Sequence, residues 1–183
     1  MSKKIDRIGE TNISNEGCIM KIVEYNNCDD IIIQFEDEYK YRLCTSYRHF
    51  KEGECKNPYF ASVLGHGYMG VDKEGNVPKI SELKDGKNIK TWEAHKWGNM
   101  LQRCFDDKFK EKYPTYKDVT CCKRWLCFSY FLEDLEILKQ EYNWNVDEKL
   151  QLDKDILYKG NKLYSLENCV LVPDWINKSI YKK

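Results

Sequence analysis

The sequence lacks any apolar run that approaches the roughly 20 residues a membrane-spanning helix requires. Its first seven residues, Met-Ser-Lys-Lys-Ile-Asp-Arg, contain no hydrophobic core of an export signal. From these two absences we expect a cytoplasmic protein with no membrane partner. Hydrophobic residues make up 42% of the chain and aromatic residues 14%, which is typical of a folded protein rather than a disordered one.

Cys-x-x-Cys pairs are also absent, although the chain contains nine cysteines. Cys122 and Cys127 are separated by four residues, a spacing that is weak for a structural zinc site. Cysteines of chains that are not exported are usually reduced. We therefore expect free, mostly buried thiols rather than a disulfide framework, and no motif indicates an organic cofactor.

An excess of basic charge is missing as well, because 30 Lys and Arg side chains balance 30 Asp and Glu side chains. Proteins that follow nucleic-acid phosphates usually carry a basic excess, so the composition does not favour strong non-specific DNA binding. Between Lys21 and Lys40 there is no basic residue at all, whereas carboxylates are frequent. This acidic stretch includes Asp29, Asp30, Glu36, Asp37 and Glu38. It is either a solvated strand edge and turn or an acidic surface that mimics nucleic acid or binds a basic protein.

The apolar periodicity predicts an α+β fold. β-branched and apolar runs predict a small antiparallel β-sheet or β-barrel over residues 1–75. These runs lie at 18–25, 31–35 and 39–45. Residues 76–91 are polar and predict a linker. Helical stripes that start at Trp92 and Trp125 predict two helices. These helices open a domain of residues 92–183.

The last part of that domain carries the chemical pattern. If residues 150–156 form one strand, Asp153 and Asp155 share a face roughly 7 Å apart, and Lys154 lies on the other, more apolar face. Two carboxylates at this separation can share a hard cation through water. A Gly160-Asn161 turn, a second strand and a helix opened by Pro173 then complete a strand–turn–strand–helix unit.

This half contains the motifs Trp97-Gly-Asn-Met-Leu-Gln-Arg-Cys104, Leu152-Asp-Lys-Asp, Glu167-Asn-Cys-Val-Leu-Val-Pro and Asn177. Together these motifs resemble those of phage-encoded proteins of the HNH homing-endonuclease group. The N-terminal part resembles the small β module that accompanies some of these proteins. The resemblance covers about half of the chain and implies two helices that support a ββα-metal unit.

In active members of that group, the resemblance implies, an Asp and a helix Asn or His bind one Mg²⁺ or Mn²⁺ ion, and a strand histidine activates water. By position, Asp153 and Asn177 match the metal ligands, with Asp155 as a further candidate, and Asn168 matches an Asn that orients the loop. Lys154 takes the place of the histidine. An ammonium group is protonated at neutral pH and cannot accept a proton from water, so the predicted site lacks its general base.

We therefore expect a phage-type protein that binds double-stranded DNA in the host cytoplasm on a degenerate nuclease scaffold, with lost or reduced cleavage. Its expected phosphate contacts are Arg103, Lys123, Arg124, Lys154, Lys159, Lys162 and Lys178. One alternative is an anti-CRISPR-like inhibitor that binds a host defence nuclease through the acidic stretch. The other is a metal-dependent HNH nicking endonuclease. The sequence leaves the oligomeric state open.

Overall fold

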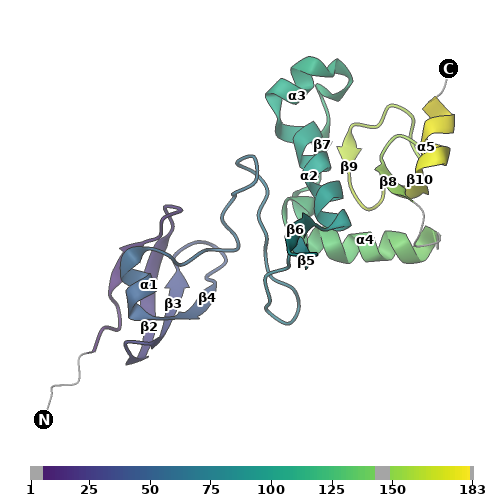
Figure 1. Cartoon of the computed structure of the whole chain (residues 1–183). Coiled ribbons are helices and arrows are strands. Elements are labelled where there is room, and N and C mark those ends of the chain that lie inside the picture. The colour runs from purple at the N-terminus through teal and green to yellow at the C-terminus, as the bar shows by residue number, and fades with distance from the viewer. Residues whose placement is uncertain (1–5, 143–148, 182–183) are drawn as a thin grey trace, which may run out of the picture. The chain divides into compact units, whose positions relative to one another are not determined.

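The chain folds into two compact units, which we call unit 1 (Met1–Phe60) and unit 2 (Ala61–Lys183) (Figure 1). A computed structural model describes residues 6–142 and 149–181. Unit 1 holds an antiparallel sheet, and unit 2 holds most of the helices, so the predicted α+β class is confirmed. By this division the segment predicted as a linker, 76–91, belongs to unit 2.

Unit 1 is built on a four-stranded antiparallel sheet in the order β1-β2-β3-β4. The strands span Thr11–Ile13, Ile19–Asn27, Asp30–Phe35 and Arg42–Thr45. In β3 the side chains of Ile31, Ile33 and Phe35 are buried, and those between them are half-buried, as expected when alternate residues point to opposite faces. The predicted sheet is thus confirmed. The barrel alternative is wrong, because in the described residues β1 and β4 remain the two edges of an open sheet.

Helix α1 (Tyr47–Glu52) packs on this sheet through Phe50. It begins at Ser46, whose hydroxyl accepts the N–H of His49 at 3.2 Å, and it ends at Gly53 with φ +71°. A Cβ at Gly53 would lie 3.0 Å from the carbonyl oxygen of Ile13, so the position requires glycine on both counts. The core of unit 1 consists of Met20, Ile22, Ile31, Ile33, Phe35, Phe50 and Cys55.

Unit 2 combines helices with three two-stranded sheets. The helices are α2 (Trp92–Phe105), α3 (Asp107–Lys112), α4 (Phe128–Tyr142) and α5 (Asp174–Tyr181), with 3₁₀ turns η1 (Pro114–Tyr116) and η2 (Lys123–Leu126). The strands are β5 (Ser81–Lys84), β6 (Lys87–Lys90), β7 (Thr120–Cys121), β8 (Leu150–Asp153), β9 (Leu163–Tyr164) and β10 (Val170–Pro173). Strand β5 pairs with β6 and β8 with β10, both antiparallel, whereas β7 and β9 are parallel.

Helices α2 and α4 carry the predicted apolar stripes into one core. Helix α2 begins at Thr91, whose hydroxyl accepts the N–H of Ala94 at 3.2 Å and so caps the helix. The indole N–H of Trp97 donates to the carbonyl oxygen of Trp125 at 2.8 Å, and that of Trp125 donates to Asp134 at 2.8 Å. Buried aromatic rings therefore keep their polar atoms bonded, as the interior requires. The stripe predicted to start at Trp125 is divided between η2 and α4.

Strand β8, strand β10 and helix α5 follow one another as strand, strand and helix. Leu152 of β8 lies opposite Leu171 of β10, and α5 begins directly after Pro173, as predicted. Strand β9, in the segment between them, pairs with β7 instead. This order agrees with the expected strand–turn–strand–helix unit, whereas the ββα-metal site stays a prediction.

The nine cysteines are all free thiols, which confirms the expected absence of a disulfide framework. Cys55, Cys104, Cys127 and Cys169 are buried, and Cys28 and Cys44 are exposed. None of the helices in the described part of the chain is long and apolar enough to cross a membrane.

Candidate functional site

The candidate site begins where β8 ends. The carboxylate of Asp153 accepts the backbone N–H groups of Asp155 at 2.7 Å and Ile156 at 3.0 Å. These bonds from a side chain to the following backbone form a turn and stop the strand. The expectation that residues 150–156 form one strand is therefore wrong, and Asp155 does not share a strand face with Asp153.

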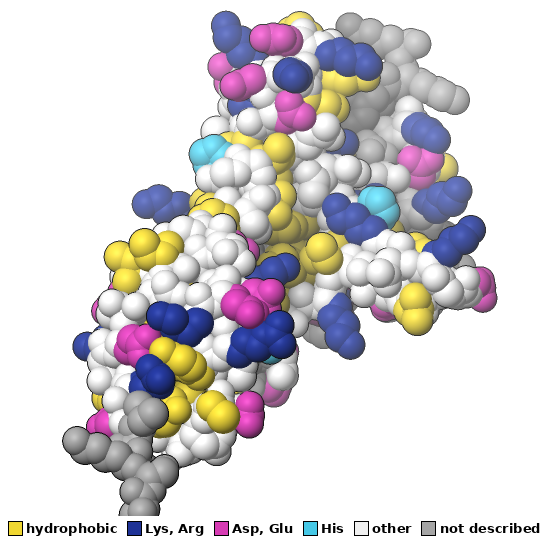
Figure 2. Space-filling view, turned by 60° about the vertical axis from the view of Figure 1, so that its left-hand side comes forward, with side chains coloured by type: hydrophobic (Ala, Val, Ile, Leu, Met, Phe, Trp, Pro, Cys, Tyr) yellow, Lys and Arg dark blue, Asp and Glu magenta, His cyan; other side chains and the backbone are white. Residues whose placement is uncertain are grey.

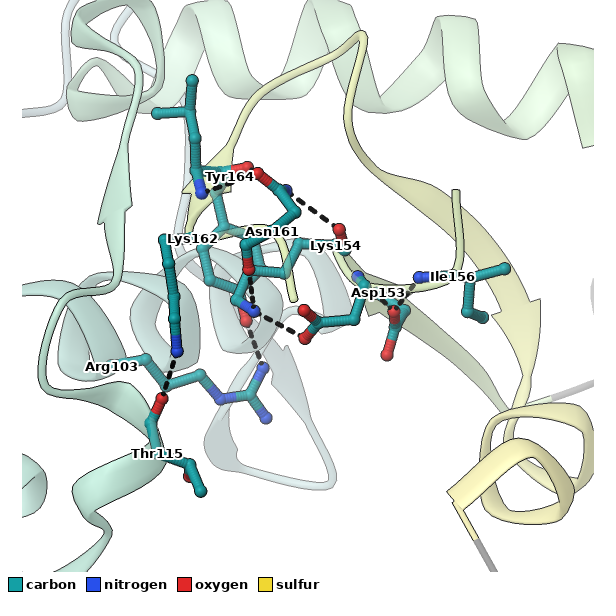
Figure 3. A network of polar contacts seen from close by, with 10 residues as sticks. Arg103, Thr115, Asp153, Lys154, Ile156, Asn161, Lys162 and Tyr164 are labelled. Carbon is teal, nitrogen blue, oxygen red and sulfur yellow. Dashed lines mark hydrogen bonds and ion pairs between the residues drawn. The ribbon is translucent and has the colours of Figure 1, made fainter. Parts of the chain in front are cut away.

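Lys154 turns inward directly after the strand. Only 6% of its side chain is exposed, and its ammonium donates to Asp155 Oδ2 at 2.5 Å and to the carbonyl oxygen of Asn161 at 2.6 Å. The same nitrogen lies 5.8 Å from the centre of the Tyr164 ring, within cation–π range. Figure 3 shows these groups turned toward one another. The ammonium is thus enclosed, and a phosphate has no access to it in this arrangement.

Asn161 completes a closure of the chain on itself. Its side-chain amide donates to the backbone carbonyl oxygen of Lys154 at 2.9 Å and to that of Leu163 at 2.8 Å. The backbone carbonyl oxygen of Asn161 accepts from the Lys154 ammonium. Residues 154 and 161 are therefore joined by two reciprocal bonds, and we call residues 154–161 the closed loop. Its tip is exposed, with 47% of Leu157 and 60% of Tyr158 accessible to solvent.

Arg103 of α2 lies behind this loop. Its guanidinium donates to the hydroxyl of Tyr164 at 2.9 Å (Figure 3). It also lies 5.4 Å from the centre of the Tyr116 ring. Burial opposes the charge, but the interactions with Tyr164, Tyr116 and Asp153 outweigh it and raise the pKa of Arg103. Burial likewise raises the pKa of Tyr164 above its ordinary value. Arg103 is thus a permanent cation that binds Tyr164, the residue whose ring faces the Lys154 ammonium.

Lys96 lies seven residues before Arg103 on α2, and it is a site residue that sequence reasoning missed. Its ammonium donates to Gln151 Oε1 at 2.8 Å, and the Gln151 amide donates to Asp174 at 3.4 Å. Burial lowers the pKa of Lys96, and the charge of Arg103 lowers it further. Lys96 therefore connects α2 to β8 and to the start of α5. Its position in an otherwise apolar stripe was the only available signal.

The predicted phosphate contacts divide into two groups. Lys123, Lys159 and Lys162 are exposed, and Lys162 donates to the carbonyl oxygen of Thr115 at 3.0 Å. Arg124 is bound to Glu133 at 2.7 Å and Asp134 at 3.0 Å, and Lys178 is bound to Asp174 at 2.5 Å. Arg124 and Lys178 are thus exposed but paired with carboxylates, whereas half-buried Arg103 and buried Lys154 serve internal contacts. On the face in Figure 2, basic side chains are interspersed with carboxylates.

The predicted metal ligands lie on separate elements: Asp153 ends β8, Asp155 follows it and Asn177 is on α5. In residues 6–142 and 149–181, no three His, Cys, Asp or Glu side chains form a group that could hold a metal ion. Asn168 and Asn177 are half-buried, on the turn before β10 and on α5. The ammonium of Lys154 already binds Asp155, and a positive charge there disfavours a divalent cation. The carboxylates of Asp153 and Asp155 therefore do not fit a shared Mg²⁺ or Mn²⁺ ion.

The carboxylates of the acidic stretch lie at opposite ends of β3. Asp29 and Asp30 precede or open the strand, and Glu36, Asp37 and Glu38 follow it, so about 20 Å of strand separates the two sets. Asp37 accepts the side-chain amide of Asn57 at 2.5 Å, and Glu36 is paired with Lys40 at 3.0 Å. The stretch is continuous in sequence but does not form one acidic surface.

The β5–β6 hairpin is a second feature that the sequence analysis missed. It carries Lys84, Lys87 and Lys90 in the segment predicted as a linker. A signal was present, because Asp-Gly between two short polar–apolar runs is typical of a two-residue hairpin turn. The hairpin adds exposed lysines to unit 2 that lie outside the closed loop.

Comparison of the chain with family models, with curated proteins and with solved structures finds no match. These comparisons neither support nor oppose the resemblance to HNH homing-endonuclease proteins. What this chain does must therefore be argued from its own residues.

Proposed function

We propose that this protein binds double-stranded DNA without cleaving it, through the closed loop and the exposed lysines beside it. The observation that carries the proposal is the enclosed ammonium of Lys154, bound to Asp155 at 2.5 Å and to Asn161 at 2.6 Å. By position in the sequence, the ammonium takes the place of the histidine of the HNH nucleases that this half resembles, and it closes the loop. One residue thus accounts for both lost hydrolysis and a fixed binding loop.

The composition of the loop tip favours a nucleic-acid partner. Tyr158 offers an exposed ring for stacking or sugar contact, and Leu157 offers an apolar contact of the kind that proteins place in DNA grooves. Lys159 and Lys162 supply positive charge for phosphates. Because residues 154 and 161 are already joined, the loop loses less conformational entropy on binding than an open loop would.

The structure of unit 1 gives the inhibitor alternative less support. That alternative needs a concentrated acidic surface, and the carboxylates of the acidic stretch are divided between the two ends of β3 and bonded to their own neighbours. DNA binding needs only a few exposed cations on a surface of mixed charge, although with net charge zero it will be weak at physiological salt.

Binding is tested by fluorescence anisotropy with a labelled duplex. If Lys123, Lys159 and Lys162 each neutralise one phosphate, affinity falls about 40-fold between 50 and 200 mM salt, from a slope of about −0.9 per contact. The variant Lys159→Ala/Lys162→Ala should lower that slope by about 1.8. As a charge-matched control, Lys21→Ala/Lys56→Ala removes two exposed lysines of unit 1 and should leave the slope unchanged. No binding at about 50 mM salt with micromolar protein would refute the proposal.

The non-cleaving part is tested separately with supercoiled plasmid and Mg²⁺ or Mn²⁺. We expect no nicked product above that of a mock purification. Nicking by the wild-type protein that disappears in Asp153→Ala would show instead that the chain is a working endonuclease.

A further inference from the structure

The β5–β6 hairpin is a two-stranded ribbon with two open faces. Strands Ser81–Lys84 and Lys87–Lys90 are joined by Asp85 and Gly86, whose φ values of +51° and +73° are those of the two-residue turn that matches strand twist. Apart from half-buried Ser81, every residue of both strands is exposed. Two-stranded hairpins are usually stabilised by a third strand or by packing on a helix. Such a covering layer is missing here in the described structure.

The side chains of the ribbon are unusual for a purely solvated turn. Leu83 is 73% exposed and Ile89 is 46% exposed. Lys84 lies directly opposite Lys87 in the register, and like charges in that position destabilise a strand pair. Lys84 is paired with Glu82 at 3.3 Å, but both side chains are more than half exposed, so this pair offsets little. An unfavourable arrangement of cations beside exposed apolar groups indicates a negatively charged partner.

We propose that this ribbon enters the major groove of double-stranded DNA and forms a second contact of the protein. The inference rests on the proposed DNA-binding function and adds the element that reads the groove. A major groove about 12 Å wide admits a two-stranded ribbon, whose strands lie about 4.8 Å apart. From residue 79 to residue 90 the segment carries four lysines and two carboxylates, a charge that complements phosphates.

The register assigns a role to each face of the ribbon. Directly opposite residues share a face, so Leu83 and Asn88 lie on one face, and Lys84 and Lys87 lie on the other. An Asn amide can bond both the N6 and N7 atoms of adenine, and an apolar side chain can contact the thymine methyl group. The face with Leu83 and Asn88 meets base edges, and the lysines around the turn bind the flanking phosphates.

The test compares salt slopes of duplex binding for the wild type, for Lys84→Ala/Lys87→Ala and for the control Lys21→Ala/Lys56→Ala. The ribbon variant should lower the slope by about 1.8, from two lost phosphate contacts, while the control keeps it. If the ribbon variant has the same salt slope as the wild type, the ribbon does not contact DNA, and the proposed function is unaffected. Failure of the wild type to bind would overturn both.

Hydrogen exchange on the unmodified protein gives a second readout that does not depend on how the variants fold. Adding excess duplex should slow exchange of the amides in residues 81–90 at least tenfold. Asn88→Ala should reduce the preference among competing duplexes about fivefold or more while the salt slope stays constant. Exchange in 81–90 that is unchanged by saturating duplex would overturn the ribbon contact.

Discussion

Replacing Lys154 with methionine tests whether the enclosed ammonium holds the closed loop together. Methionine preserves much of the apolar stem but removes the donor to Asp155 and to the carbonyl oxygen of Asn161. Breaking a fully buried ion pair costs about 3–5 kcal/mol. Because the Asp155 side chain is 30% exposed and regains water, we expect a smaller loss of about 2 kcal/mol in the free energy of unfolding of unit 2.

The measurement is urea and thermal unfolding followed by tryptophan fluorescence. All five tryptophans lie at position 92 or later, so this signal reports on unit 2 alone. A loss of about 2 kcal/mol corresponds to a fall of about 8 °C in the melting temperature for a unit of this size. Circular dichroism of the two units together would mix their transitions, which is why fluorescence is preferred.

Lys178→Met is the matched control. Its ion pair with Asp174 has the same 2.5 Å length as the Lys154 pair, but 69% of the Lys178 side chain is exposed. An exposed pair of this kind on a helix is worth about 0.3–0.5 kcal/mol. If Lys154→Met costs no more than Lys178→Met, burial of the ammonium does not hold the loop, and our reasoning about the site is refuted.

The other predictions concern the loop, one helix cap and the thiols. Asn161→Ala removes three side-chain hydrogen bonds, and it should cost about 1–3 kcal/mol by the same assay. It should also speed proteolysis between residues 155 and 160, and equal cleavage rates would contradict the closure. The backbone N–H of Phe109 donates to Asp106 and lowers the pKa of this carboxyl group below its ordinary value of 3.8. The carboxylate therefore stabilises α3 fully at a pH above its pKa in the unfolded chain, and it loses that effect as the pH falls through its lower pKa in the folded chain. Urea midpoints at pH 7 and pH 3 should therefore show the advantage of the wild type over Asp106→Asn shrinking in acid. A thiol-reactive dye should label exposed Cys28 first and Cys44 more slowly, because a hydrogen bond to Asp30 raises the pKa of Cys44. The buried thiols should react only after unfolding; they are Cys55, Cys104, Cys127 and Cys169. Mass spectrometry of the labelled peptides checks this order.

Long apolar stripes made the helices predictable. The stripe of α2 and its Thr91 cap both follow from local sequence, because a helix of 14 residues repeats its burial pattern several times. Strand β3 was readable from its run of β-branched and apolar residues, although the run itself does not show which side chains are buried. An element with a long apolar pattern can therefore be predicted from the sequence.

The site was harder to predict because single side chains decide it. Asp153 ends β8 by accepting two backbone N–H groups, and nothing in the alternation of residues 150–156 distinguishes that from a continuing strand. The inward turn of Lys154 depends on Asn161, seven residues later, and on Tyr164. The acidic stretch was misleading for another reason: its carboxylates are close in sequence, but β3 separates them into two sets in space.

The enclosure of Lys154 bears on the proposed function, because it shows how the polar groups around the ammonium are used. A site that had only lost its base would leave polar groups pointing into the space where the reaction took place. In the described part of the chain no buried side-chain nitrogen or oxygen lacks a hydrogen-bond partner. Asn161 returns two bonds to the backbone on either side of the closure, and Arg103 binds the hydroxyl of Tyr164 behind it. Because a buried cation is tolerated only when its surroundings compensate its desolvation, these residues form one polar network around Lys154. That network holds the exposed loop tip in place, and this is the reason why we propose binding rather than hydrolysis for the site.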